Sequence, residues 1–324
     1  MSESPPDLKT SESGRVSSTR LTWRDWLMQT TSFRFGMFTT YVLLAFTVVI
    51  ALSPIEFSPG PRSEVPATVF SWLPSSLIRS GVFFFIARIV LIASAICWAM
   101  RKWLPISSWA TVAAAFLYWS LRMENLTNGA HIFHATSMLL FIHAVWFHFY
   151  YRSINAGFDQ PSGDASSRCY PRWVFWLCVF YLGWFHSLAG FSKIASSGLA
   201  WGNGASLQLW VDLFGWKGSP FAQLILLDTR LTAVLQSGAL LIECASILAI
   251  VNRWFRYAIG LGLFGFYLGV LTTFIDFGFH FNATLVALFL LPTDRLFGLF
   301  DDVSTEVRSK VKLPDGSPAS NDAD

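Results

Sequence analysis

The chain has 324 residues, of which 53% are hydrophobic, 17% aromatic and only 13% charged. This composition is too apolar for a soluble protein of this length and indicates an integral membrane protein. The net charge of +3 is small and the basic residues are scattered, which argues against a nucleic-acid partner. The four cysteines show no CxxC spacing, so we expect neither a disulfide framework nor a zinc site.

The two ends of the chain are polar and low in complexity. Residues 1–20 and 304–324 are rich in Ser, Pro, Asp and Gly, and we predict disordered tails there. The first 20 residues contain no apolar run of the kind that a signal peptide needs, so the first membrane helix is expected to act as the insertion signal. A single transmembrane domain is predicted between the tails, over residues 21–303.

Between the tails, apolar segments recur that are long enough to cross a bilayer, which takes roughly 20 residues. Eight such segments lie at 34–52, 78–99, 106–121, 131–150, 172–194, 231–251, 254–275 and 277–292. Two further stretches, 21–31 and 203–228, mix tryptophans with charged residues and glycines, as in interfacial or re-entrant helices. The sequence therefore predicts an all-α fold, a polytopic transmembrane helix bundle of about eight spans plus interfacial helices.

The basic residues predict an orientation. An even number of spans places both termini on one side, which would hold sixteen of the 23 Lys and Arg residues, against five on the other side and two within spans. Cytoplasmic loops carry the excess of basic residues. We therefore predict a multi-pass protein of the cell inner membrane with both termini in the cytoplasm.

The fifth span ends in a lysine, Lys193, which is followed by a Gly/Ser-rich segment that carries Trp201 and Gly204. An ionisable side chain within a membrane is costly and points to a functional site. A desolvated lysine can act as a general base. The alternative is that Lys193 snorkels to the headgroups and has no further role.

Several histidines are expected near the depth of Lys193. His131 and His134 open the fourth span, His280 lies at the start of the eighth, and His186 precedes Lys193 by two turns on nearly the same helical face. His131 is a candidate catalytic residue and the other three are candidate ligand-binding groups, and the alternative is a hydrogen bond to a neighbouring helix.

The remaining two histidines, His143 and His148, are predicted near the cytoplasmic interface, where solvation is cheap and a hydrogen bond to a neighbouring helix is expected to satisfy them. His131 and His148 lie too far apart along the helix to share an ion. His131 and His134 are one turn apart and could share one only with a further ligand from another segment, so we predict no metal site.

Glu243 is the only carboxylate predicted in the middle of a span, and there it needs a partner. Arg88 is the natural partner by its rarity, which predicts a structural ion pair between Arg88 and Glu243. Alternatively, Glu243 assists proton transfer at Lys193. Motifs of nucleotide-binding proteins, hydrolases and zinc proteases are absent from the sequence.

The sequence AGFSK, which ends at Lys193, followed by WGNG, which starts at Trp201, resembles the membrane region of vitamin K-dependent gamma-carboxylases and of their bacterial relatives, the HTTM (horizontally transferred transmembrane) domain proteins. His131, Glu243 and the closing segment FHFNATLVALFLLPTDRLF support the resemblance over residues 20–300. It implies a carboxylase-like or oxidoreductase-like membrane enzyme in which Lys193 is the base that acts on a quinone.

The chain departs from the carboxylase pattern. Ala130 stands where the carboxylase has an asparagine before its histidine, residues 257–276 contain no histidine, and three extra residues separate Lys193 from Trp201. Because the chain ends soon after the last span, we do not expect gamma-carboxylation of protein glutamate.

Two functions are therefore carried forward. The first is an outer-leaflet cavity for a lipid-soluble ligand, such as a quinone or an isoprenoid, in contact with membrane lipids. Its candidate catalytic residues are Lys193, His131 and Glu243, and its candidate ligand-binding residues are His134, His186, His280, Arg88, Trp201 and Gly204. The second is a non-catalytic subunit or scaffold that packs its 15 Trp and 31 Phe against lipids or a membrane protein partner.

Overall fold

The structure, a computed structural model, describes residues 30–53, 74–78, 80–125, 132–159, 170–274 and 277–298. These residues are almost entirely helical. Their α-helices are α2 (Phe33–Leu52), α3 (Ser75–Ile78), α4 (Gly81–Ala99), α5 (Ile106–Asn125), α6 (Ile132–Asp159), α7 (Arg172–Ser197), α8 (Ala205–Phe214), α9 (Pro220–Leu227), α10 (Thr229–Ala245), α11 (Arg253–Phe274) and α12 (Phe277–Phe289). The predicted tails and His131 lie outside the described residues.

Short elements complete the fold. A 3₁₀ helix, Gly198–Asn203, follows α7, and another, Ser246–Ile250, follows α10. Two short strands, β1 (Thr30–Thr31) and β2 (Tyr170–Pro171), pair antiparallel and bring the start of α2 beside the start of α7.

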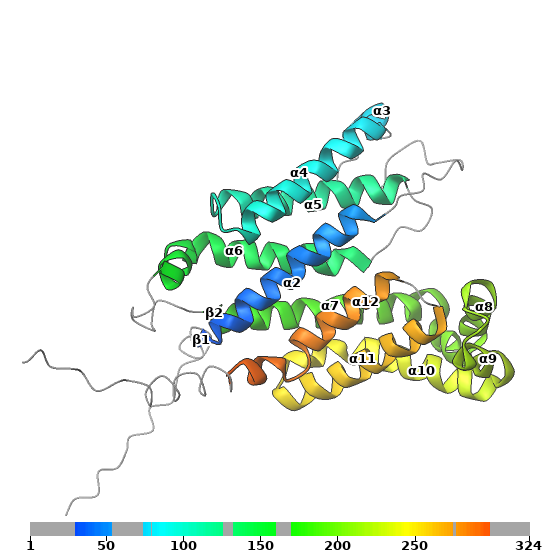
Figure 1. Cartoon of the computed structure of the whole chain (residues 1–324). Helices are drawn as coiled ribbons and strands as arrows, with labels where there is room; N and C mark the ends of the chain where they lie inside the picture. Colours follow the sequence, from blue (N-terminus) through cyan, green and yellow to red (C-terminus); the bar gives the residue numbers. More distant parts are fainter. Residues whose placement is uncertain are drawn as a thin grey trace, which may run out of the picture.

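Each of the eight predicted apolar segments coincides with a helix, namely α2, α4, α5, α6, α7, α10, α11 or α12. These helices lie side by side with alternating direction, and α8 and α9 pack at the end of the bundle where α7 ends (Figure 1). Five of the helices, α2, α4, α7, α10 and α11, are long and apolar enough to cross a membrane, with the 3₁₀ turns counted in α7 and α10. The all-α membrane fold is confirmed, and the full count of eight spans stays a prediction.

One aromatic part of the largest core cluster lies where α2, α6, β2, α7 and α12 meet. Phe35, Trp146, Tyr170, Phe175 and Phe289 are all buried there. Their rings pack in edge and tilted contacts, such as Trp146 against Tyr170 with ring centroids 4.8 Å apart. This aromatic packing holds the start of α7 against α2 and α12.

His143 is part of this core. Its Nδ1 lies 2.8 Å from the Leu139 carbonyl oxygen, and its Nε2 lies 3.2 Å from the Thr39 hydroxyl and 3.4 Å from the Tyr170 hydroxyl. Solvent does not reach His143, which is fully buried. The expectation that a hydrogen bond to a neighbouring helix satisfies this histidine is confirmed by the Thr39 hydroxyl of α2.

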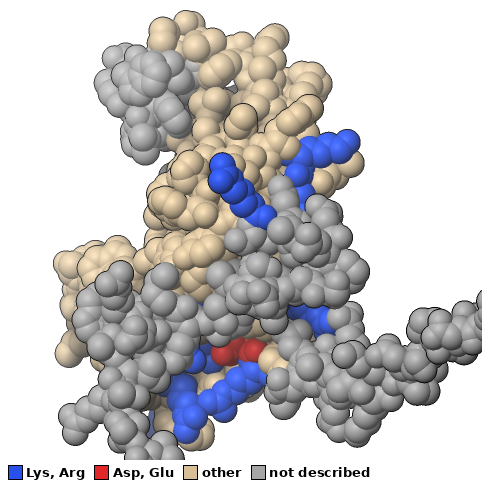
Figure 2. Space-filling view, turned by 90° about the vertical axis from the view of Figure 1, so that its left-hand side faces the viewer, with Lys and Arg blue, Asp and Glu red and all other residues tan. Residues whose placement is uncertain are grey.

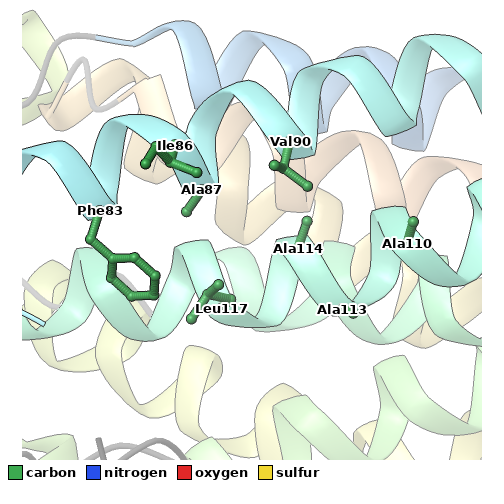
Figure 3. Close-up of a pocket in the computed structure, with 8 residues that line it drawn as sticks. All are labelled: Phe83, Ile86, Ala87, Val90, Ala110, Ala113, Ala114 and Leu117. Carbon is green, nitrogen blue, oxygen red and sulfur yellow. The ribbon is translucent and has the colours of Figure 1, made fainter. Parts of the chain in front are cut away.

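The outer faces of the bundle are apolar. Val82 on α4, Leu241 on α10 and Leu261 on α11 are each at least 67% exposed, as expected for side chains that face lipid rather than water. A groove of about 330 Å³ runs between α4 and α5 (Figure 3). Its lining consists of Phe, Ile, Val, Leu and Ala side chains, so it offers no polar group that would orient a ligand.

Basic side chains gather at the end of the bundle where α2, α7 and α11 begin. Figure 2 views this end and shows Lys and Arg side chains around a small acidic patch. By their positions in the helices, eight described basic residues belong to this end: Arg34, Arg101, Lys102, Arg152, Arg172, Arg253, Arg256 and Arg295. Four described basic residues, Arg122, Lys193, Lys217 and Arg230, belong to the opposite end.

Candidate functional site

The site begins with a face of small residues on α7. Gly183, Ser187 and Gly190 recur at helical spacing and let α7 approach the end of α10 closely. A Cβ added at Gly190 would lie 2.7 Å from the Cys244 backbone nitrogen, and one added at Gly183 would lie 2.7 Å from the Ser246 carbonyl oxygen. Larger residues at either glycine would push the two helices apart.

Ser187 satisfies the backbone where α10 changes to a 3₁₀ helix. Its hydroxyl oxygen lies 3.2 Å from the Glu243 carbonyl oxygen and 3.1 Å from the Cys244 carbonyl oxygen, and it accepts a hydrogen bond of 2.9 Å from the Ile247 N–H. Such help is needed because a change of helix type frees backbone groups that lipid cannot satisfy. Ser187 thereby stabilises the turn that presents Glu243 to α7.

Glu243 forms an ion pair with Lys193, which lies one turn beyond Gly190 on α7. The Glu243 side chain is 6% exposed and the Lys193 side chain 28% exposed, so the carboxylate is buried and the ammonium partly accessible. The predicted ion pair between Arg88 and Glu243 is wrong. Arg88 lies half-buried on α4, whereas the close contact of α7 with α10 gives Glu243 its partner.

Trp201 covers the ion pair from the 3₁₀ helix that follows α7. The Lys193 ammonium lies 4.8 Å from the centroid of the Trp201 ring, in the range of a cation–π interaction. Lys193 is therefore held by a carboxylate and by an aromatic face.

Gln236 of α10 fixes the segment that carries Trp201. Its amide, 2% exposed, donates to the Trp201 carbonyl oxygen and to the Ser206 hydroxyl, and its oxygen accepts from the Leu207 N–H at 3.1 Å. Gly204 has a φ of +90°, and a Cβ there would lie 2.7 Å from the Ala233 nitrogen. Glycine is required at this position both for the backbone conformation and for the close approach to α10.

His186 lies two turns deeper on α7 and pairs with Tyr267 of α11. Its Nδ1 lies 2.7 Å from the Leu182 carbonyl oxygen, and its Nε2 lies 2.7 Å from the Tyr267 hydroxyl. Because a carbonyl only accepts, Nδ1 carries a proton. A neutral ring would then accept the Tyr267 proton at Nε2. The alternative of a hydrogen bond to a neighbouring helix is confirmed for His186.

The polar side chains continue to α12. Asn282, 5% exposed, lies beside the Tyr267 hydroxyl, and its Oδ1 has no hydrogen-bond partner among the described residues. Glu243, Lys193, His186, Tyr267 and Asn282 thus form a polar strip contributed by α10, α7, α11 and α12. An unpartnered buried oxygen at its end is a group that a ligand or a water molecule would satisfy.

Two predicted ligand-binding residues lie elsewhere at the same end of the bundle. The starts of α6 and α12 lie at the end where α7 finishes (Figure 1), and these starts carry His134 and His280. Both histidines are exposed, in contrast to the buried His186.

The sequence analysis did not single out Ser187, Gln236 or Tyr267, which hold the site together. The sequence feature that could have revealed them is a polar side chain within an apolar helix. This feature indicates a functional role only weakly for a serine or a tyrosine, and more strongly for a glutamine. No family model, curated protein or solved structure matches this chain.

Proposed function

We propose that this chain is a multi-pass membrane protein whose site at Lys193 and Glu243 binds a lipid-soluble molecule with an acidic hydroxyl group and takes its proton. The single observation that carries the proposal is the buried Glu243 carboxylate paired with a partly exposed Lys193 ammonium. Intramembrane ion pairs of this kind mark ligand and proton pathways.

The two residues of the ion pair have different roles in this proposal. The Glu243 carboxylate accepts the proton as the ligand O–H bond breaks, and the Lys193 ammonium stabilises the ligand oxyanion that forms. The charge of the site, ligand included, stays constant, because the negative charge moves from the carboxylate to the ligand beside the same ammonium. Constant charge matters where transfer of a net charge into the bundle is costly.

A paired ammonium has no lone pair, so Lys193 would act as a base only after passing its own proton to Glu243. This modifies the sequence-based hypothesis that Lys193 is itself the base. Trp201 offers an aromatic face to a ring of the ligand, and Asn282 offers a free acceptor. A hydroquinone has both a ring and acidic hydroxyls, and the resemblance of AGFSK and WGNG to the carboxylase pattern is the reason to place quinones first.

The test is to purify the protein in mild detergent, extract it with organic solvent and identify lipid-soluble molecules by mass spectrometry. Wild type is compared with Lys193→Ala, Glu243→Gln and the control Lys217→Ala, which removes an exposed lysine from the same end of the bundle. We expect a quinone, or an isoprenoid that carries an acidic hydroxyl group, in wild type and control, and loss of at least tenfold in both site variants. Bulk phospholipid alone in all four samples would refute the proposal and favour the scaffold function.

We further propose that both termini are cytoplasmic and that the membrane is the inner membrane. The excess of basic residues at the end where α2, α7 and α11 begin supports this orientation. Reporter fusions that are active on only one side of the membrane, placed before residue 1 and after residue 324, should both report the cytoplasm. Activity of either reporter on the outer side would refute this orientation.

A further inference from the structure

A buried arginine lies at the opposite end of α7 from Lys193. Arg256, near the start of α11, is 3% exposed, and its guanidinium lies 2.9 Å from an Asp294 carboxylate oxygen and 3.1 Å from the Tyr257 hydroxyl. The same guanidinium lies 4.8 Å from the ring centroids of Phe175 and of Tyr257. One ion pair and two aromatic faces therefore fix Arg256 in place.

Two more arginines, Arg253 and Arg295, lie near Arg256. The guanidinium carbon of Arg295 lies 5.6 Å from the Tyr257 ring centroid. The guanidinium carbon of Arg253 lies 5.2 Å from the Trp254 ring centroid. Both are exposed, and neither forms an ion pair within the part of the chain that the structure describes. Arg256 engages Asp294, so the cluster of three arginines retains a net positive charge.

The surroundings of the cluster are apolar and aromatic. Trp254 is 67% exposed, Phe255 45% and Leu296 54%, and Leu261 continues an exposed apolar surface two turns further along α11. Tryptophan and arginine together on an exposed apolar surface are typical of the membrane–water interface. A ligand that matches this surface has an anionic headgroup and an apolar tail.

We propose that Arg253 and Arg295 bind the phosphate of an anionic phospholipid, whose acyl chain lies along the exposed apolar side chains of α11. Arginine suits this role because its planar guanidinium binds phosphate oxygens through two parallel hydrogen bonds. The pair of Arg256 and Asp294 positions Tyr257, and Arg295 packs against the Tyr257 ring. This lipid site stands independently of the function proposed for Lys193.

The test is titration of the detergent-purified full chain with phosphatidylglycerol or phosphatidylcholine, followed by native mass spectrometry. The variant Arg253→Gln/Arg295→Gln is compared with Lys102→Gln/Arg152→Gln. The second variant removes the same charge from exposed residues at the same end of the bundle. We expect the affinity for phosphatidylglycerol to fall about 25-fold in the first variant, about fivefold for each arginine, and less than about twofold in the control. Binding of phosphatidylcholine should be weak and equal in all samples.

Three results would overturn the proposal. Equal losses in both double variants would mean that general surface charge binds the lipid. An unchanged affinity in Arg253→Gln/Arg295→Gln would exclude these arginines. Displacement of the lipid by millimolar inorganic phosphate would assign the site to free phosphate. The single variant Arg295→Gln, which changes one exposed side chain, gives a second measurement with an expected loss of about fivefold.

Discussion

Two ion pairs lie at opposite ends of α7 and differ in which partner is buried. Near the start of α7, the Arg256 cation is 3% exposed and the Asp294 anion 20%, whereas near its end the Lys193 cation is 28% exposed and the Glu243 anion 6%. Phe175, against Arg256, and Lys193 are 18 residues apart in the sequence, or roughly 27 Å along a helix. This is close to the hydrocarbon thickness of a bilayer, about 30 Å, and we infer that the two pairs lie near the two interfaces.

The two ion pairs also differ in whether their cation, the Arg256 guanidinium or the Lys193 ammonium, can give up a proton. A guanidinium does not lose its proton in proteins, so the pair of Arg256 and Asp294 is permanently charged. An ammonium and a carboxylate can exchange a proton and become a neutral pair. The first pair is therefore suited to fixing helices, and the second is suited to changing its protonation state during function.

The largest expected effect comes from leaving Arg256 without its carboxylate. Asp294→Ala should cost about 3–5 kcal/mol of unfolding free energy, because a buried guanidinium is left uncompensated. Chemical unfolding in detergent micelles measures the loss. The double variant Asp294→Ala/Arg256→Met should recover more than half of it, and a cost below about 1 kcal/mol would show that Arg256 is well solvated.

A smaller loss is expected when Glu243 is left without its lysine. Lys193→Met should cost about 1–2 kcal/mol, since the buried carboxyl can take up a proton and become a neutral group that still needs a hydrogen bond. The same unfolding measurement applies, and Lys193→Met/Glu243→Gln provides the neutral control. A cost as large as that of Asp294→Ala would contradict the idea that the charge of this pair can change.

The sequence predicted the helices well because the length and apolar composition of each segment are enough to identify it as a helix. All eight segments form helices, and the stretch 203–228 contains the short helices α8 and α9, as expected for surface or re-entrant elements. Lys193 and Glu243 stood out for the same reason, since a charged residue within an apolar run is visible without a partner.

The pairing within the site could not be predicted in the same way. Lys193 and Glu243 are 50 residues apart, and their contact depends on how closely Gly183 and Gly190 let α10 approach. Arg88 was chosen as the partner of Glu243 by its rarity, which carries no information on helix packing. Gln236 was missed because it bonds largely to backbone groups of a segment about 30 residues away.

The smallest effect is expected at the exposed ion pair between Asp212 of α8 and Lys217, which lies between α8 and α9. The Lys217 nitrogen and the Asp212 oxygen are 2.9 Å apart, as close as those of Arg256 and Asp294, but the Lys217 side chain is 58% exposed and the Asp212 side chain 66%. Asp212→Ala should therefore cost less than about 0.5 kcal/mol, because water already solvates both charges. The ion pairs of Asp212 with Lys217 and of Asp294 with Arg256 have the same N–O distance but differ in burial. Comparing Asp212→Ala with Asp294→Ala therefore measures the effect of burial at constant distance. A loss of several kcal/mol in the same unfolding experiment would mean that α8 lies within the bilayer, where this pair too would be desolvated.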